Sequence, residues 1–480
     1  MRNYLLATAL ACAAAPAAAA DCASLLTAKL PMAEVTAASI VAAGTPPLNP
    51  TADVCRVTVT ARPSAGSDIR IELWIPQGQA WNGKYMQVGN GGFAGSIPYR
   101  TMVLGLRAGY AVAGTDTGHQ SPDGTDARWA LGHPEKVIDF GWRSIKATTD
   151  AAKALLTAYG TPAKRAYFLG CSDGGREALM AAQRFPAEFD GIVAGAPASH
   201  WTSLMASAGL LAKTMARPQF SIPLTKLPAL QAAALKACGV GKAWIAAPQQ
   251  CRFDPQVIAC PGGTNTDQCL TRGEVATVRM VYRGQRDPAT GRTLYGLRPG
   301  AETGWQGWLV ADPARAADQG FAPSYFANLV RQDAAFRIAD LTTADLKASD
   351  AKLAPVLNAT SSDLTAFRAR GGKLIQYHGW NDPAIAPSYS LAYAAALEAK
   401  LGDTSDFYRL YMIPGMLHCG GGASPTRVDW IKQIEAWVEG GTAPGVLTAT
   451  AADGTAQALY PAVSASAPRG DGKATSSPTS

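Results

Sequence analysis

Hydrophobic and polar residues alternate along two segments early in the chain, 55–60 and 69–75. Alternation with a period of two predicts strands that bury one face, and two such strands in succession favour an antiparallel start to a sheet. Shorter, mostly apolar segments follow at 84–88, 110–113, 167–169 and 191–195. The last two flank a helical pattern that begins at Arg176. Strand, helix and strand in this order form a parallel crossover unit, so the pattern predicts an α/β fold.

The rhythm of strands and helices stops after residue 201 and returns after residue 350. The second part contains further predicted strands and helices at 374–377, 389–401, 407–413 and 428–438. The segment between, 202–350, lacks the rhythm and carries many prolines and a cluster of four cysteines. We therefore predict a core in two parts, 21–201 and 351–463, with an inserted lid domain at 202–350. Residues 464–480 are rich in Ser, Pro, Gly and Ala, which predicts a disordered tail.

The N-terminal twenty residues have the composition of a secretory signal peptide. Arg2 precedes an apolar stretch at 4–15, and the small residues 18–20 form a cleavage site, so residues 1–20 are expected to be removed. An uncleaved membrane anchor is the alternative, although the apolar stretch is short. No later segment approaches the roughly 20 continuous apolar residues that a membrane span needs. We expect a secreted or periplasmic protein with no membrane partner.

Charge and cysteine content narrow the class of protein further. The chain has 43 Lys and Arg against 36 Asp and Glu, without a basic run interleaved with aromatic residues, so no nucleic-acid partner is predicted. Eight of the nine cysteines remain once Cys12 leaves with the signal peptide, and an even number in an oxidising compartment predicts four disulfides. The simplest pairing within the lid is Cys238 with Cys251 and Cys260 with Cys269. That cluster has no C-x-x-C pair and no nearby histidine, so a zinc site is not expected.

The candidate nucleophile is Ser172, in the sequence Gly170-Cys171-Ser172-Asp173-Gly174 between a predicted strand and a predicted helix. This G-x-S-x-G context is typical of a nucleophile elbow, where a sharp turn exposes the serine hydroxyl above the sheet. An ordinary Gly-rich turn is the alternative in a chain with 48 glycines. The loop 89–95 follows a predicted strand and has four glycines in seven residues. Such a loop can donate a backbone N–H to an oxyanion hole, or it can be a flexible surface loop.

The general base is predicted by elimination, because this kind of fold orders its triad as serine, then acid, then histidine. His119 precedes Ser172 and is therefore assigned a structural role. His200 follows the serine too early, and His378 lies at a strand end with the acid position directly behind it. His418 lies in the loop after the strand that ends near 413, where the catalytic histidine belongs. We predict that His418 is the base.

The predicted acid is Asp382, in the loop Gly379-Trp380-Asn381-Asp382-Pro383 after the strand 374–377. Asn-Asp-Pro also favours a turn, and both roles are compatible. Asp403 and Asp406, which precede the next strand, are the alternatives.

Two cysteines directly adjoin the predicted nucleophile and base. Cys171 precedes the serine, and Cys419 follows the histidine. If the fold brings the serine and the histidine within hydrogen-bond reach, as catalysis requires, these cysteines come close enough to bridge. Exported cysteines that lie near one another usually form disulfides.

Together, Cys171-Ser172, Asp382 and His418-Cys419 resemble the CS-D-HC pattern of the tannase and feruloyl esterase family, which also includes bacterial hydrolases of terephthalate monoesters. The resemblance extends to 189–197, 251–255 and 377–382 and runs through most of the mature chain. It implies an α/β-hydrolase core with an inserted lid and a carboxylic ester substrate whose acyl part is often aromatic. It also implies a Cys171–Cys419 bridge, a Cys22–Cys55 bridge, and oxyanion donors at the backbone N–H groups of Asp173 and Gly92.

The lid departs from that family in one loop. Family members commonly bind calcium through an Asp-rich loop that follows a cysteine matching Cys238. Here the loop 239–250 contains no carboxylate, whereas calcium usually needs several oxygen ligands that include carboxylates. We therefore predict no calcium at this loop, and no cofactor.

The resulting hypothesis is hydrolysis of an aromatic ester in two steps through an acyl-serine intermediate. Aromatic lid residues would cover the acyl pocket, or they simply form the core of the lid; they are Trp305, Trp308, Phe321, Tyr325, Phe326 and Phe336. An exported peptidase on the same fold is one alternative. A catalytically silent binding protein is another, against which the intact Ser, Asp and His argue.

Overall fold

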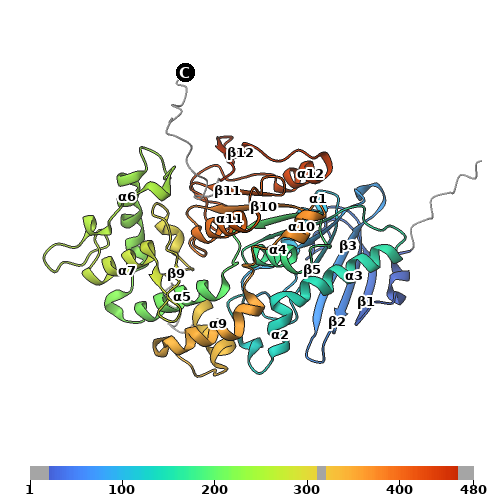
Figure 1. Cartoon of the computed structure of the whole chain (residues 1–480), viewed down its shortest axis with the longest axis horizontal. Coiled ribbons are helices and arrows are strands. Elements are labelled where there is room, and N and C mark those ends of the chain that lie inside the picture. Colours follow the sequence, from blue (N-terminus) through green and yellow to red (C-terminus); the bar gives the residue numbers. More distant parts are fainter. Residues whose placement is uncertain (1–20, 311–319, 463–480) are drawn as a thin grey trace, which may run out of the picture.

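The computed structural model describes residues 21–310 and 320–462. They form a nine-stranded sheet in the order β1-β2-β3-β5-β4-β6-β7-β10-β11 (Figure 1). The predicted signal peptide and the predicted disordered tail lie outside the described residues. Within the two described ranges, none of the helices combines the length and hydrophobicity needed to cross a membrane.

The strands of the sheet are β1 Ala33–Val41, β2 Val54–Ala61, β3 Ile69–Pro76, β4 Tyr85–Val88, β5 Ala111–Thr115, β6 Ala166–Cys171, β7 Gly191–Gly195, β10 Lys373–Gly379 and β11 Tyr408–Ile413. The first three are antiparallel, and β3 pairs antiparallel with β5. From β5 to β11 the pairing is parallel. The strands predicted from the sequence are therefore confirmed. The sequence analysis missed β1, an edge strand with no fully buried position and hence no clear alternation.

Helices cover both faces of the sheet. They are α1 Tyr99–Arg107, α3 Ser144–Ala158, α4 Asp173–Arg184, α10 Thr365–Ala369, α11 Ser388–Leu401 and α12 Trp430–Gly440. The short helix α2 Pro134–Ile138 instead contributes Val137 to the apolar cluster of the lid. Apolar residues of α3, α4 and α11, such as Leu155, Leu179 and Leu397, belong to the cluster on one face. Met102 of α1 and Trp437 of α12 belong to the cluster on the other face. This three-layer arrangement is the predicted α/β-hydrolase core. A small hairpin, β12 Leu447–Thr450 with β13 Ala456–Leu459, follows α12.

The lid is inserted between β7 and β10, which are neighbouring strands of the sheet. Its elements are α5 Trp201–Met215, α6 Leu227–Cys238, α7 Arg272–Arg283, β8 Gln285–Arg286, β9 Thr293–Leu294, α8 Phe321–Tyr325 and α9 Thr343–Leu357. Together with loops of the core, they surround a separate apolar cluster, and α5, α6 and α7 form the green and yellow lobe in Figure 1. The boundaries predicted at 201 and 350 fall at the start of α5 and inside α9. Both are Ala-containing helices whose composition does not mark the transition between lid and core.

Four disulfide bonds lie within the described residues, and their pairing is the one expected from the sequence. One closes a separation of 248 residues and joins the end of β6 to the loop after β11. The bonds are Cys22–Cys55, Cys171–Cys419, Cys238–Cys251 and Cys260–Cys269.

The turn from β6 to α4 is sharp, and its serine is backbone-strained. Ser172 has φ 66° and ψ −122°, a conformation that residues other than glycine seldom adopt. Helix α4 begins directly after it, earlier than the predicted start at Arg176. Glycines in the first turn of α4 hid this start, since they are poor helix formers, but packing requires them. A Cβ on Gly175 of α4 would lie 2.2 Å from the carbonyl oxygen of Gly195. In β6, a Cβ on Gly170 would lie 2.2 Å from the carbonyl oxygen of Gly174.

Substituting Gly170→Ala is expected to destabilise the fold by about 1–3 kcal/mol, because the new methyl group overlaps the backbone of α4. Urea unfolding followed by circular dichroism measures this free energy. Gly445→Ala is the matched control, since a Cβ there has no heavy atom within 4 Å, and it should change stability by less than about 0.5 kcal/mol. Equal stability of the two variants would contradict the packing argument.

Candidate active site

Asp382 lies directly after β10 and is fully buried. One of its carboxylate oxygens, Oδ1, accepts the backbone N–H groups of Ala384 and Ile385 at 2.8 and 2.9 Å. The other oxygen, Oδ2, lies 2.7 Å from Nδ1 of His418. The backbone bonds fix the orientation of the carboxylate, so that Oδ2 faces the imidazole.

The electrostatics of this pair favour an ionised acid. Burial alone would raise the pKa of Asp382, but the charge of His418 and the hydrogen bonds from His378 and His418 together lower it well below its ordinary value. An ionised Oδ2 accepts a hydrogen bond, so Nδ1 of His418 carries the proton. Nε2 is therefore the ring nitrogen that can take up or release a proton.

The bridge between Cys171 and Cys419 joins the turn that holds Ser172 to the loop that holds His418, with 5.9 Å between the two cysteine Cα atoms. Both Ser172 and Cys419 have positive φ, 66° and 62°. Within the described residues the Ser172 hydroxyl has no hydrogen bond to His418. Such bonds are often long in substrate-free sites and shorten when substrate binds. The structure thus brings together the predicted serine, acid and histidine.

The alternative candidates lie in other environments. His119 stacks on Trp129, with 3.8 Å between ring centroids, and its Nε2 lies 2.9 Å from the carbonyl of Phe93. Asp406 forms an ion pair with Arg368. Asp403 accepts the N–H of the nearby residue 405. Each of these groups is engaged by a partner other than His418.

The two predicted oxyanion donors face the same cavity as Ser172, since Gly92 and Asp173 line it with the serine. In the described part of the chain, neither of their backbone N–H groups donates to a protein acceptor. Gly92 has φ 58°, and a Cβ there would lie 2.4 Å from the carbonyl oxygen of Gly124, so the position requires glycine. Asp173 is the first residue of α4, where the helix dipole also favours a developing negative charge.

The side chain of Asp173 is occupied by a buried ion pair. Its carboxylate accepts Nε of Arg176 at 2.6 Å, and both side chains are at most 1% exposed. The Arg176 guanidinium also stacks against Phe140 and Trp201, with its central carbon 4.8 and 5.2 Å from the ring centroids. The carboxylate beside the serine is therefore neutralised within the protein, and the backbone N–H is the group that Asp173 can offer to a substrate.

A second buried acid supports the glycine loop. The carboxyl group of Glu177, on α4, accepts the backbone N–H of Asn90 at 2.9 Å. Burial, reinforced by the charge of Asp173, raises the pKa of Glu177 to about 8. Glu177 therefore holds the start of the loop that contains Gly92.

A cavity of about 680 Å³ lies between the core and the lid, and Ser172 is on its wall. Much of the wall is an apolar face of α5 that the sequence analysis did not identify: Leu204, Met205, Ala208, Leu211, Ala212 and Met215. Of the predicted lid aromatics, Trp308 and Phe321 line the cavity. Their rings stack at 6.1 Å, and Trp308 meets the His418 ring edge-on at 4.8 Å. Trp305, Tyr325 and Phe326 are buried in the apolar cluster around the lid, and Phe336 packs against it, so these four belong to the core of the lid.

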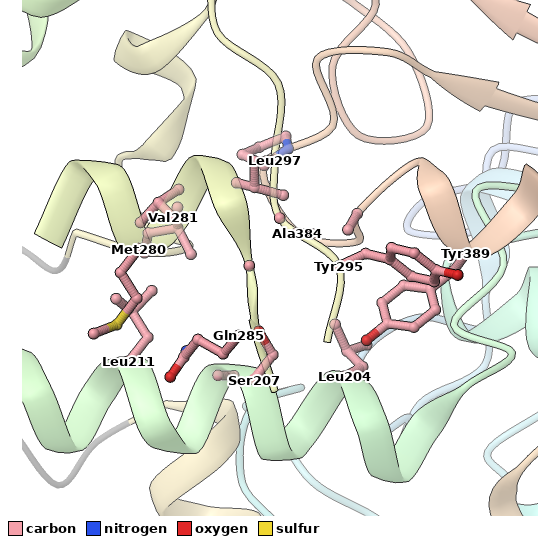
Figure 2. Close-up of a pocket in the computed structure, with 16 residues that line it drawn as sticks. Leu204, Ser207, Leu211, Met280, Val281, Gln285, Tyr295, Leu297, Ala384 and Tyr389 are labelled. Carbon is pink, nitrogen blue, oxygen red and sulfur yellow. The ribbon is translucent and has the colours of Figure 1, made fainter. Parts of the chain in front are cut away.

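A smaller pocket of about 60 Å³ adjoins this cavity (Figure 2). Side chains of α5 face Met280 and Val281 of α7 across it, and Tyr295 and Tyr389 lie at one end. It shares wall residues such as Leu204 and Leu211 with the larger cavity. Ser172 is absent from its wall, whereas it lines the larger cavity.

The residues of the lid loop 239–250 do not fit a calcium ion. The loop holds no carboxylate. The side chains of Trp244 and Ile245 in this loop instead pack against other segments of the protein, Trp244 against Gly415 and Ile245 against Gly300. Among residues 21–310 and 320–462, no group of three or more His, Cys, Asp or Glu side chains is arranged to hold a metal ion.

Comparison with known proteins identifies the family. A profile described as tannase and feruloyl esterase matches residues 54–474. The chain belongs to this family. It is therefore a carboxylic ester hydrolase, and its substrate is a small-molecule ester.

Individual relatives agree with this assignment. An uncharacterized esterase of Xanthomonas campestris pv. campestris is 38% identical, over 89% of this chain and 83% of its own. A mono(2-hydroxyethyl) terephthalate hydrolase of Piscinibacter sakaiensis is 30% identical, over 80% of this chain and 75% of its own. The crystal structure of feruloyl esterase B from Aspergillus oryzae has the same fold, with a TM-score of 0.83 and 24% identity over 92% of this chain and 95% of that one.

Removing the bridge beside the serine, with Cys171→Ala and Cys419→Ala together, is expected to lower kcat of the esterase by about 10-fold or more. Small displacements of reacting groups cost rate of this order. Steady-state kinetics on a chromogenic ester measure it. The matched control, Cys22→Ala with Cys55→Ala, removes a disulfide on the far side of the core and should lower stability without changing kcat. Unchanged turnover in the first variant would exclude a catalytic contribution of the bridge.

Replacing Glu177→Gln is expected to change how the esterase's stability depends on pH. In the wild type, the folded pKa of about 8 exceeds the unfolded value of about 4.3, so the folded state binds more protons between these values and stability falls as pH rises through them. The amide cannot ionise, so the variant should gain stability relative to wild type as pH increases to about 8.

Urea unfolding at about pH 5 and about pH 9 measures this difference. Glu34→Gln is the control, since the Glu34 side chain is 63% exposed, and it should leave the pH dependence as in the wild type. A constant difference between Glu177→Gln and wild type at both pH values would contradict the raised pKa.

Proposed function

We propose that this chain is an exported serine esterase that cleaves esters of aromatic acids through an acyl intermediate on Ser172. The observation that carries the proposal is the 2.7 Å contact between Asp382 and His418, in a loop linked by a disulfide to the residue before the serine. That arrangement links an oriented base to the strained turn of Ser172, a residue on the cavity wall. Together they are the requirements for an activated serine nucleophile.

The chemistry follows in two balanced steps. Nε2 of His418 accepts the hydroxyl proton while the Ser172 oxygen attacks the ester carbonyl, and the carbonyl oxygen gains negative charge. The backbone N–H groups of Asp173 and Gly92 stabilise that oxyanion. The bond to the alcohol breaks, and the alcohol leaves with the proton from His418. Water then repeats the sequence on the acyl-enzyme, which releases the acid and restores the serine.

The wall of the cavity favours an aromatic acyl group without charge. The stacked rings of Trp308 and Phe321 offer a flat apolar surface close to His418. No Lys or Arg is among the described residues that line the cavity, so these residues offer no counterion to a free carboxylate on the acyl group. Gallate- and hydroxycinnamate-like esters therefore fit the described wall better than a terephthalate monoester. The lack of a cation in the described wall, together with the occupied carboxylate of Asp173, also disfavours a peptidase that anchors a chain terminus.

The proposal also includes that the protein is exported and that its reaction needs no metal ion. The four disulfides are expected in a chain that folds in an oxidising compartment, secreted or periplasmic. The reaction above uses side chains and backbone of the protein alone. The carboxylate-free loop 239–250 supports a lid without calcium.

A panel of esters tests the proposal: methyl gallate, methyl ferulate, chlorogenate, a terephthalate monoester and a peptide anilide. We expect hydrolysis of at least one of the first three, about 10-fold or more slower hydrolysis of the charged monoester, and no cleavage of the anilide. Ser172→Ala should lower kcat by about 10³-fold or more, since the nucleophile is lost. Release of acid is measured by liquid chromatography.

The other possible results of this panel would support a different function or mechanism. Cleavage of the anilide at a comparable rate would favour the peptidase, and absence of any hydrolysis by the folded protein would favour a binding protein. Retained activity in Ser172→Ala would exclude the acyl-serine mechanism.

A further inference from the structure

His378 is a second imidazole on the predicted catalytic acid, and the mechanism above gives it no role. It is fully buried near the end of β10. Its Nε2 lies 3.3 Å from Oδ2 of Asp382, the same oxygen that binds His418. The same nitrogen lies 3.1 Å from the carbonyl oxygen of Ile385. Because an ionised carboxylate and a carbonyl both accept hydrogen bonds, Nε2 of His378 must carry a proton.

A series of hydrogen-bonded polar side chains on the Nδ1 side of the ring fixes the Nε2–H tautomer of His378. Nδ1 of His378 lies 2.7 Å from the hydroxyl of Ser390, on α11. Ser390 accepts the amide N–H of Gln376 at 2.7 Å, and Gln376 in turn accepts the hydroxyl of Tyr408 at 3.0 Å. The Ser390 hydroxyl therefore donates its own proton to Nδ1 of His378. Each group donates to the next, from Tyr408 on β11 to the acid.

This series of hydrogen-bonded side chains is buried, and secondary structure holds its members in place. Gln376, His378 and Ser390 are all 0% exposed. Gln376 and His378 are two residues apart on β10, so both side chains point to the same face of the sheet, beneath α11. Buried polar side chains that pair completely hold one geometry, because every alternative leaves a polar group without a partner.

We propose that His378 is the positioning residue of the catalytic acid. Its Nε2–H spans Oδ2 of Asp382 and the carbonyl of Ile385, whose own N–H binds Oδ1 of the same carboxylate at 2.9 Å. His378 thus fixes both the acid and the turn that orients it, and through them the ring of His418. The inference rests on the proposed triad. His378 is fully buried and is not among the described residues that line the cavity.

Two substitutions separate this role from simple packing. The amide nitrogen of His378→Gln can occupy the place of Nε2 and keep the donor to Asp382. In His378→Asn the shorter amide reaches the place of Nδ1, toward Ser390, and leaves Asp382 without the donor. We expect His378→Asn to lower kcat by about 10- to 100-fold, as for the loss of a hydrogen bond to a charged group, with KM changed less than about twofold. His378→Gln should stay within about threefold of wild type.

A second pair of variants tests the polar chain. Ser390→Ala removes the hydroxyl that holds the tautomer and should lower kcat in the same direction, by about threefold or more. Ser388→Ala is its matched control on the same helix, because the Ser388 hydroxyl binds Arg298 at 3.1 Å rather than His378, and it should leave kcat unchanged. Thermal unfolding of every variant establishes that the folded fraction is the same at the assay temperature.

Asp382→Asn and Ser172→Ala, assayed in parallel, distinguish this inference from the proposed function. If both abolish activity while His378→Asn retains wild-type kcat, the positioning role is wrong and the triad stands. Equal losses in His378→Asn and His378→Gln would also overturn it, since packing rather than the Nε2 donor would then be responsible. If Ser172→Ala keeps its activity, the triad itself fails.

Discussion

The Cys171–Cys419 bond is the constraint on which the rest of the site depends. Its two cysteines adjoin the predicted nucleophile and base, and they come from β6 and the loop after β11, which are separated in the sheet by β7 and β10. The bond closes a loop with a sequence separation of 248, which contains the whole lid. On chain-entropy arguments a loop of this length stabilises the folded state by about 5 kcal/mol. The same bond therefore stabilises the folded core, encloses the lid within its loop and brings the two halves of the site together.

The core and the lid contribute different parts of the site. The parallel sheet places Ser172, Asp382 and His418 in turns at the carboxyl ends of β6, β10 and β11, where a rigid scaffold holds them. The lid supplies the greater part of the cavity wall, through α5 and the segment around Trp308. The edge-on contact of Trp308 with His418 joins the two parts. Substitutions in the lid can therefore alter the cavity wall while Ser172 and Asp382, which the core holds, keep their places.

The sequence was sufficient for the core and for candidates that lie at the same edge of the sheet, because chain order and strand ends fix where a serine, an acid and a histidine can meet. It was insufficient for the cavity, since an apolar helix face such as that of α5 gives the same pattern whether it packs on a core or lines a pocket. It also could not assign His378. That residue's role depends on Ser390 and Tyr408, which approach it from other elements, and their separation along the chain carries no signal of this contact.

Asp382 shows why function and stability cannot be separated here. An ionised carboxylate that is fully buried is strongly destabilising unless all of its hydrogen bonds are satisfied. Oδ1 receives two backbone N–H groups, and Oδ2 receives His418 and His378. The bonds that make the buried charge tolerable are the same bonds that aim it at the base. The carboxylate cannot turn away from His418 without leaving an unpaired charge in the protein interior, and this penalty keeps it in the orientation that the proposed mechanism needs before substrate arrives.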